Sequence, residues 1–287
     1  MLVQNGVKKI NHNIHELLPA VNDEHGGIIV LVEDPMEPNV FHYMLKHSIK
    51  VWKLQGKKGV WIKMPIELAN LVEIAVKEGF WYHHAEPDYL MLVHWIADSE
   101  STIPANASHK VSIGAIVFNH KREVYTPKLA LFLLWRHQLK GSGIWKIPTG
   151  TVEEGESIFE GAIRELKEET GIDTEFLEVL AFRQIPKSFF NKSDLFFLCM
   201  MRPLSFDIQK QDLEIEAAQW MPFEEYANQP LIQKDGLSNY IKDLCLAKAE
   251  RDYQGFTPMA ITSSVFDDHM SSLYFLKDGL DQENSAL

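Results

Sequence analysis

Hydrophobic and polar positions repeat with two different periods along the chain, which predicts a mixture of strands and helices. In the first third of the chain, short apolar runs predict strands, and apolar positions spaced three and four residues apart predict helices. The expected elements are a strand at 27–33, a helix at 37–54, a strand at 59–63, a helix at 66–79, and two short aromatic strands within 81–96 that Pro87 separates. This order is typical of a small α+β domain.

Residues 98–109 are small and polar and include a proline, so we interpret them as a linker. After the linker, the same patterns predict six strands and two helices. The strands are expected at 111–118, 129–135, 144–147, 175–185, 195–201 and 214–221, and the helices at 157–170 and 238–253. We therefore expect an N-terminal domain at 1–105, a second domain at 106–260 and a C-terminal tail at 261–287.

Composition narrows the functional classes. The 287 residues include 40 acidic and 28 basic side chains, a net charge of −12. Nucleic-acid binders are more often basic, because phosphate contacts dominate their affinity, whereas a metal-assisted enzyme tolerates many carboxylates. No apolar run reaches the roughly 18 residues of a membrane helix, and the N-terminus lacks the features of a signal peptide. We expect a protein of the cytosol, with access to the nucleus, and neither a nucleic acid nor a membrane as partner.

The most informative stretch is 150–172, which holds seven acidic and two basic residues. Ser157 and Glu160 have the spacing of a capping box, which predicts the start of a helix, and Gly171 suits a left-handed end. Between them, the apolar positions form one stripe that faces a sheet. These positions are Phe159, Ala162, Ile163 and Leu166.

Glu165, Glu168 and Glu169 are spaced so that their carboxylates share another face of this helix. Like charges at such spacing destabilise a helix by a few tenths of a kcal/mol per pair, and a divalent cation would offset this repulsion. Three oxygen donors suit Mg²⁺ or Mn²⁺. The alternative is a solvated acidic face, the usual state of a glutamate-rich helix. The preceding loop favours the metal site, since Gly150 permits close approach of a ligand.

The whole stretch resembles the signature of the Nudix hydrolases, G-x5-E-x7-R-E-U-x-E-E-x-G-U, where U is aliphatic. All fixed positions are present, and both aliphatic positions are filled. They are Gly150, Glu156, Arg164, Glu165, Glu168, Glu169 and Gly171, with Leu166 and Ile172 as the aliphatic residues. Chance agreement at seven fixed positions is on the order of 10⁻⁸ per window. The resemblance covers roughly 111–221. It implies an α/β/α sandwich with a mixed sheet, and hydrolysis of a diphosphate that links a nucleoside to another group.

The resemblance also implies roles for individual residues. Glu165, Glu168 and Glu169 would bind Mg²⁺, or alternatively Mn²⁺, with the Gly150 carbonyl as a further ligand. Glu156 and Arg164 would pair across the loop and the helix as structural partners, together with the helix end at Gly171.

The general base is left open between two places. It is a glutamate of the motif in some relatives, above all at the position of Glu169, and a residue of a later loop in others. Glu214 and Glu216 are the candidates on such a loop here. The alternative for these two is an ordinary exposed position at the start of a strand.

Cations and aromatic residues shortly after the motif are candidates for substrate binding. Arg183, Lys187 and Lys192 could hold a phosphate, and Phe189 or Phe190 could stack on a base. The alternative for the phenylalanines is burial in a strand core, where adjacent residues face opposite ways.

The two-domain layout resembles one Nudix subfamily more closely, through residues 145–150 before the motif and 192–197 after it. This subfamily includes plant cytosolic hydrolases of ADP-ribose and NADH, and an animal protein encoded antisense to a fibroblast growth factor gene. The resemblance implies these nucleotide conjugates as substrates, release of AMP, a homodimer, and an acetyltransferase-like N-terminal domain that dimerises or shapes the substrate site.

Two departures from related patterns keep other substrates open. Pro186 follows Gly171 by 15 residues, whereas some ADP-ribose hydrolases have a proline at 16, and the signature of bacterial-type NADH hydrolases is absent. Coenzyme A, dinucleoside polyphosphates and oxidised nucleotides therefore remain alternatives. A different class of function also remains, a regulatory module that binds ADP-ribose or NADH with little turnover.

Overall fold

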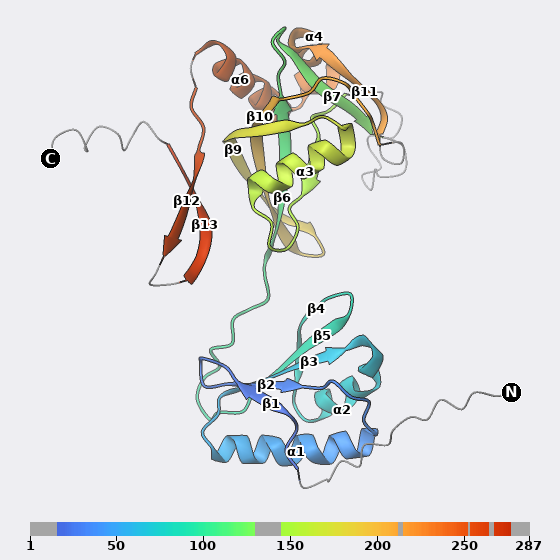
Figure 1. Cartoon of the computed structure of the whole chain (residues 1–287), viewed down its shortest axis with the longest axis vertical. Helices are drawn as coiled ribbons and strands as arrows, with labels where there is room; N and C mark the ends of the chain where they lie inside the picture. The colour runs from blue at the N-terminus through green and yellow to red at the C-terminus, as the bar shows by residue number, and fades with distance from the viewer. Residues whose placement is uncertain (1–15, 130–144, 212–214, 252, 264–266, 277–287) are drawn as a thin grey trace, which may run out of the picture. The chain divides into compact units, whose positions relative to one another are not determined.

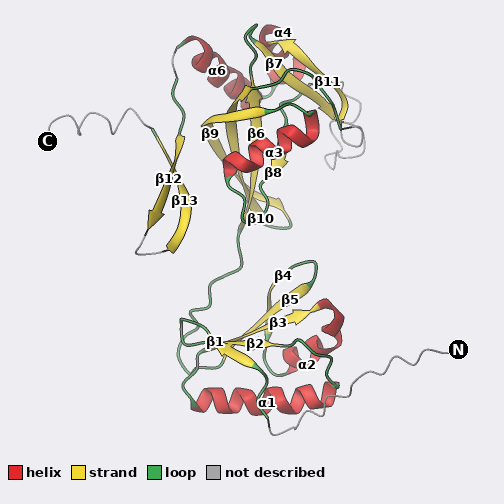
Figure 2. Cartoon of the chain, in the orientation of Figure 1, coloured by secondary structure: helices red, strands yellow, loops and turns green. Residues whose placement is uncertain are grey.

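The computed structural model describes residues 16–129, 145–211, 215–251, 253–263 and 267–276 (Figures 1 and 2). The chain divides into two compact units, Met1–Ala107 and Ser108–Leu287. Their boundary falls within the polar segment that we interpret as a linker. No helix among the described residues is long and apolar enough to cross a membrane.

The N-terminal unit is a five-stranded sheet with helices on one face. The strands are β1 (Ala20–Asn22), β2 (Ile28–Leu31), β3 (Gly59–Pro65), β4 (Trp81–Ala85) and β5 (Tyr89–Trp95), in the order β1-β2-β3-β5-β4. The helices are α1 (Pro38–Leu54), the 3₁₀-helix η1 (Ile66–Leu71) and α2 (Val72–Lys77). Alternate strand residues such as Val60 and Ile62 pack with Phe41 and Leu45 of α1 in one core. The opposite face of the sheet therefore carries the intervening residues.

The predicted helix at 66–79 is two helices in the structure. The backbone of Leu68 departs from helical geometry, with φ −107° and ψ 21°, and the first part of the segment has 3₁₀ character. The other N-terminal elements agree with the sequence pattern, including the break between β4 and β5 next to Pro87.

The second unit contains a four-stranded mixed sheet in the order β8-β6-β10-β9, in which β6 and β10 run parallel. Its strands are β6 (His109–Val117), β8 (Thr149–Thr151), β9 (Thr174–Phe189) and β10 (Lys192–Pro203). The helices are α3 (Ile158–Thr170), α4 (Phe223–Ala227), α5 (Pro230–Lys234) and α6 (Gly236–Glu250). The remaining strands form two small sheets, β7 (Glu123–Leu129) with β11 (Ile215–Pro222), and β12 (Thr257–Ser263) with β13 (Asp267–Phe275).

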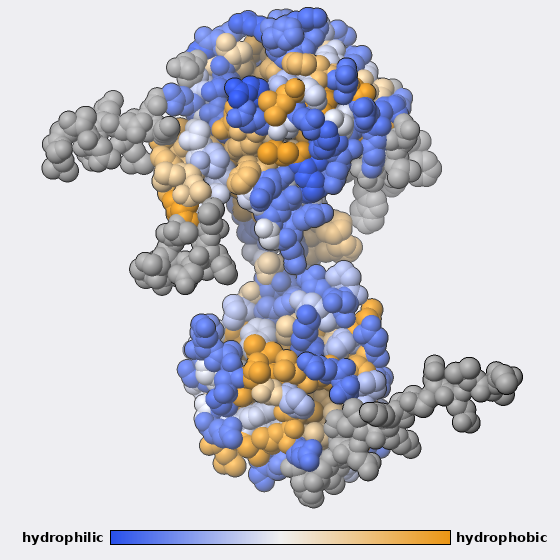
Figure 3. All heavy atoms as spheres, viewed as in Figure 1, coloured by the Kyte–Doolittle hydropathy of each residue, from blue (hydrophilic) through white to orange (hydrophobic). Residues whose placement is uncertain are grey.

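Helices cover both faces of the four-stranded sheet, as alternate residues of β6 show. Ile113 and Ala115 pack with Leu166 of α3 in one core, and Ile116 packs with Cys245 of α6 in another. This arrangement is the expected α/β/α sandwich, which is confirmed. Both cysteines are buried, as their apolar sequence neighbours predict. In Figure 3, apolar residues also reach the surface as scattered patches among hydrophilic ones.

Three features of this unit differ from the sequence pattern. The strand β7 was not predicted, because Pro127 and its polar neighbours weaken the apolar pattern there. Nearly all of the strand expected at 129–135 lies outside the described residues. The strand expected at 144–147 is displaced to β8. The antiparallel pair of β12 and β13 begins before the predicted tail at 261–287 and continues into it, and its serine and threonine content hides its alternation.

We expect Gly114→Ala to destabilise the second unit by about 1–3 kcal/mol through overpacking. A Cβ atom on Gly114 would lie 2.3 Å from Cζ of Phe196 and 3.0 Å from Cδ1 of Ile147. Gly236→Ala is the matched control, because its Cβ meets nothing within 4 Å. Urea unfolding of both variants and the wild type measures the difference, and equal midpoints for the two variants would contradict this packing.

Candidate active site

The helix α3 begins and ends where the motif predicts. The Ser157 hydroxyl accepts a hydrogen bond from the Glu160 amide at 3.3 Å, and the Glu160 carboxylate accepts one from the Ser157 amide at 2.9 Å. At the other end Gly171 adopts φ +72°, and its amide donates to the carbonyl of Lys167. Ala162 and Leu166 are fully buried, so packing on the sheet fixes which face of α3 is exposed.

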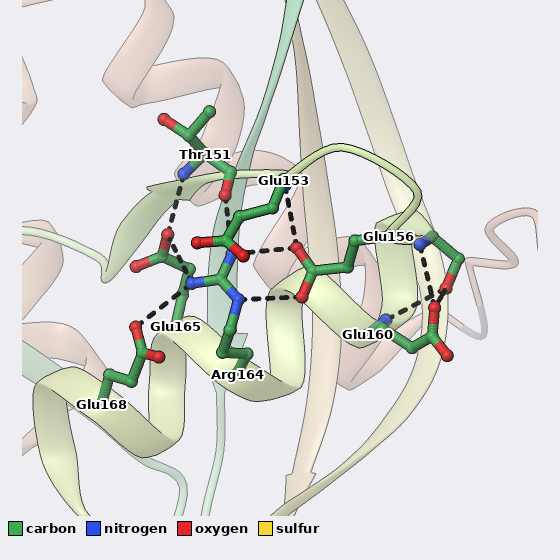
Figure 4. Close-up of polar contacts among 8 residues, drawn as sticks. Thr151, Glu153, Glu156, Glu160, Arg164, Glu165 and Glu168 are labelled. Atoms are coloured by element: carbon green, nitrogen blue, oxygen red, sulfur yellow. Dashed lines mark hydrogen bonds and ion pairs between the residues drawn. The ribbon is translucent and has the colours of Figure 1, made fainter. Parts of the chain in front are cut away.

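Arg164 joins α3 to the loop that precedes it (Figure 4). Its Nε donates to Oε1 of Glu156 at 2.8 Å, and its Nη2 donates to Oε2 at 2.9 Å. The same Nη2 donates to the carbonyl of Thr151 at 2.8 Å. These bonds lower the pKa of the Glu156 carboxyl below its usual value and raise the pKa of Arg164 above its own. The ion pair expected from the motif is therefore present, and it has the strong bidentate geometry.

Glu165 lies directly against Gly150. The Thr151 amide donates to Oε1 of Glu165 at 3.0 Å, and Nη1 of Arg164 lies 3.2 Å from the same oxygen. A Cβ atom on Gly150 would lie 1.9 Å from the carboxyl carbon of Glu165. Only glycine leaves room for the carboxylate at this place, which explains the residue type at the first position of the motif.

The three motif glutamates have different surroundings. Glu165 and Glu168 both reach Nη1 of Arg164, at 3.2 and 3.1 Å, and the Glu168 side chain is 58% exposed. Glu169 is buried, with 6% of the residue exposed. The three carboxylates therefore differ in exposure, because the packing that positions α3 on the sheet also removes Glu169 from solvent. Within the part of the chain that the structure describes, no three acidic, histidine or cysteine residues already converge as a metal cluster.

The residues nevertheless suit a hard divalent cation. Carboxylate oxygens are the donors that Mg²⁺ and Mn²⁺ prefer. The Arg164 guanidinium group already provides positive charge between Glu165 and Glu168. The Gly150 cradle holds Glu165 in place, and the exposed Glu168 is free of packing constraints on rotation.

Tyr125 on β7 is a site residue that the sequence pattern does not reveal. It is fully buried, and its hydroxyl has no hydrogen-bond partner among the described residues. Burial raises the pKa of Tyr125 well above its usual value, and the charge of Glu169 adds to this effect. Its ring packs edge-on against Trp220 of β11 at 5.8 Å. The phenol of Tyr125, on a strand far from the motif in sequence, therefore lies on the buried side of the glutamate cluster.

The candidate bases outside the motif follow a loop beside α3. The amide of Gln211 donates to the carbonyl of Glu169 at 3.1 Å, and the amide of Ile215 donates to the carbonyl of Gln211 at 3.0 Å. The chain flanking Glu214 thus reaches the end of α3, while Glu214 itself lies outside the described residues. Glu216 is exposed on β11, next to a bulge.

The substrate-binding candidates separate into two groups. Phe189 ends β9, and Phe190 follows it in the turn to β10. The two residues are 55% and 80% exposed, and their rings meet edge-on at 4.5 Å. The alternative that they are strand core is therefore wrong. Lys187 is exposed on the same hairpin, and Lys192 is half-buried at the start of β10.

Arg183 lies on the other face of the sheet from α3. It pairs in register with Phe196, which packs in the core beneath α6, and paired residues of antiparallel strands point to the same face. Its charge also lowers the pKa of Asp235, although two hydrogen bonds to Asp235 from Ser238 have the larger effect. The structure thus places this candidate phosphate ligand on the face away from α3, because its direction depends on a strand register that the sequence pattern does not define.

The pH dependence of stability tests the pair of Glu156 and Arg164. Because the folded state lowers the pKa of Glu156, the pair stabilises fully above the ordinary carboxyl pKa of about 4.3, and its contribution disappears as the pH falls through the lower, folded value. We expect Glu156→Gln to lose about 1.5–3 kcal/mol at pH 7 and the deficit to shrink below about pH 4. Urea unfolding from pH 3 to 7 measures it, with the exposed Glu154→Gln as control; a deficit independent of pH would contradict the assignment.

Comparison with known proteins agrees with this geometry. A family model described as a NUDIX domain matches residues 108–244, and one described as a Nudix hydrolase domain matches residues 18–96. Nudix hydrolase 10 of Arabidopsis thaliana is 57% identical over 96% of this chain and 94% of its own length. The human protein named nucleoside diphosphate-linked moiety X motif 6 is 34% identical over 71% of this chain and 65% of its own.

Among solved structures, a UDP-X diphosphatase is 20% identical and covers 53% of this chain and 68% of its own, with a TM-score of 0.40. That likeness is too distant to add to the argument. The sequence relatives extend over both units, and the family models match one unit each. The chain therefore belongs to the Nudix hydrolase family.

Proposed function

We propose that this hydrolase cleaves the diphosphate bond of nucleoside diphosphate conjugates, with ADP-ribose and NADH as the leading substrates and AMP as a product. The observation that carries the proposal is the Glu165 carboxylate seated on Gly150, with Glu168 and Glu169 on the same helix. Such a cluster of carboxylates concentrates negative charge, which a bound cation would neutralise. A diphosphate is also negatively charged and needs a cation to neutralise it.

Hydrolases of this family generally use divalent metal ions. We propose Mg²⁺, with Mn²⁺ as a substitute, held by Glu165, Glu168 and Glu169 and by the Gly150 carbonyl. When bound, such an ion neutralises the diphosphate oxygens, orients a water molecule and lowers its pKa. Glu168 would leave Nη1 of Arg164, whereas the two bonds to Glu156 keep Arg164 in place.

The proton from the attacking water needs a carboxylate acceptor. Glu169 is buried within the glutamate cluster, and its charge acts on the buried phenol of Tyr125. We propose Glu169 as the leading base, with Glu214 and Glu216 as the alternatives on the loop that contacts the end of α3.

The hairpin of β9 and β10 supplies the leading substrate contacts. Its two exposed phenylalanine rings offer apolar surface for a nucleobase, and Lys187 and Lys192 offer charge for a phosphate. Arg183 is not part of this set. As further parts of the proposal, the protein acts as a homodimer in the cytosol, with access to the nucleus, and uses neither a nucleic acid nor a membrane as partner.

A second candidate is a regulatory module that binds ADP-ribose or NADH with little turnover. The observation that favours it is that Nη1 of Arg164 contacts both Glu165 and Glu168 and would compete with a cation for them. A panel of ADP-ribose, NADH, coenzyme A, dinucleoside polyphosphates and oxidised nucleotides separates the two. If ADP-ribose binds but no compound of the panel yields a product in Mg²⁺ or Mn²⁺, the result would support the regulatory module and contradict hydrolysis.

We expect Glu168→Gln and Glu169→Gln each to reduce metal-dependent release of AMP by on the order of 10²–10⁴, because each removes a charge next to the cation and Glu169→Gln also removes the leading base. Folding should change little, since glutamine keeps the size and shape of the glutamate side chain. Steady-state kinetics with chromatography of the products measures the loss, and Glu154→Gln is the control. Wild-type turnover in both variants would overturn the assignment of these glutamates.

Gly150→Ala tests the cradle separately from the charge. The new methyl group would overlap the Glu165 carboxylate, so we expect a lower kcat and a higher Mg²⁺ concentration for half-activation. All carboxylates remain in this variant, and Gly236→Ala in open space is the control. An unchanged Mg²⁺ dependence would show that the seat of Glu165 is not part of the cation site.

A further inference from the structure

The N-terminal unit contains a cavity of about 440 Å³ on the sheet face that the helices leave uncovered. Val60 and Ile62 point from β3 into the helix-covered core, so Gly59 and Trp61 point to the other face. Gly59 pairs in register with Trp95 of the antiparallel strand β5, which places this second indole on the same face. All residues that line the cavity fall between 23 and 104, inside the N-terminal unit.

Gly59 forms the floor of a slot between apolar groups. A Cβ atom on Gly59 would lie 3.8 Å from Nε1 of Trp61, 3.8 Å from Cε3 of Trp95 and 3.9 Å from Cδ1 of Ile103. These are ordinary van der Waals distances, so an atom of a ligand at this point would contact two indole rings and one aliphatic chain together. The absence of a side chain on Gly59 is what leaves the slot open.

The walls of the slot are held in place by other bonds. Nε1 of Trp95 donates to the carbonyl of Ser99 at 2.7 Å, and the ring of Trp61 meets the ring of His83 edge-on at 5.0 Å. Nε2 of His83 lies 2.9 Å from the carbonyl of Pro104. The segment that carries Ile103 is thus fastened to the sheet at two points, and the slot is formed before a ligand arrives.

The rim of the cavity favours an anion. Lys58 and His25 are exposed there, and Lys58 forms no ion pair with any other described residue. Asp23 is the one acidic lining residue, and its Oδ1 already accepts from the amides of His25 at 2.8 Å and Gly27 at 2.5 Å. Its negative charge is therefore partly balanced by the backbone, whereas the charge of Lys58 is available.

We propose that this cavity binds a nucleoside 5′-monophosphate, with the base in the slot above Gly59 and the phosphate at Lys58 and His25. The volume lies within the range of about 300–1,000 Å³ that is usual for small-molecule sites. Indole rings bind planar bases by stacking without strong dependence on the base, and an ammonium group at the rim selects the phosphate. The site does not depend on the glutamates of α3 or on a metal ion.

Gly59→Val fills the slot and is the main test. The substitution suits a strand, and its Cβ meets only ordinary contacts, so the fold should be retained. The full-length chain is titrated in EDTA with AMP, GMP, adenosine and inorganic phosphate, by calorimetry and tryptophan fluorescence. We expect AMP and GMP to bind the wild type with similar affinity, Gly59→Val to weaken both at least tenfold, and hydrolysis by Gly59→Val to stay at the wild-type rate.

Lys58→Ala tests the phosphate contact, with its sequence neighbour Lys57→Ala as the matched control outside the cavity. We expect Lys58→Ala to weaken AMP about fivefold or more and to leave adenosine unchanged, and Lys57→Ala to have no effect. The proposal is overturned if AMP fails to bind the wild type in EDTA, if Gly59→Val binds AMP normally, or if binding is lost in Glu169→Gln instead. Adenosine binding as tight as AMP, with no effect of Lys58→Ala, would overturn the phosphate assignment.

Discussion

The ion pair between Arg164 and Glu156 is the interaction on which the geometry of the active site depends. Two parallel hydrogen bonds join the charged groups, and a third runs from Arg164 to the carbonyl of Thr151, so the loop cannot move independently of α3. Only 23% and 14% of the two side chains is exposed, which weakens solvent screening. Because the amide of the same Thr151 holds Glu165, the position of the first glutamate is set through this pair as well.

Arg164 also explains how α3 keeps like charges close together. Its Nη1 contacts Glu165 and Glu168, and this attraction offsets the repulsion between them. A divalent cation and Nη1 would compete for these same carboxylates. Glu168 is the one that can move at little cost, since more than half of it is exposed, whereas Glu165 is confined by Gly150 and Thr151. Binding of a cation at these carboxylates, as proposed, would therefore rearrange one side chain and leave the loop intact.

The features that the sequence predicted well are short-range. The ends of α3 and the partner of Arg164 follow from residues within one or two turns, where spacing alone defines contact. Contacts that depend on strand register were not predictable. Arg183 faces α6 because of its pairing with β10, and Tyr125 meets the environment of Glu169 only through the fold. A bulge in β4 similarly brings Nδ1 of His83 within 2.7 Å of Nδ1 of His84, although adjacent strand residues ordinarily diverge.

In the N-terminal unit, helices cover only one face of the sheet. An uncovered face of a sheet is normally polar, since side chains there meet water. Here that face carries two tryptophans next to a glycine, and the polypeptide of the linker region covers part of them. Tryptophans at such positions are expected to be buried, yet Trp61 and Trp95 remain partly exposed around an open cavity. A ligand explains such an open aromatic surface better than stability does. If stability were the reason, a larger residue at position 59 would bury the same rings with no ligand.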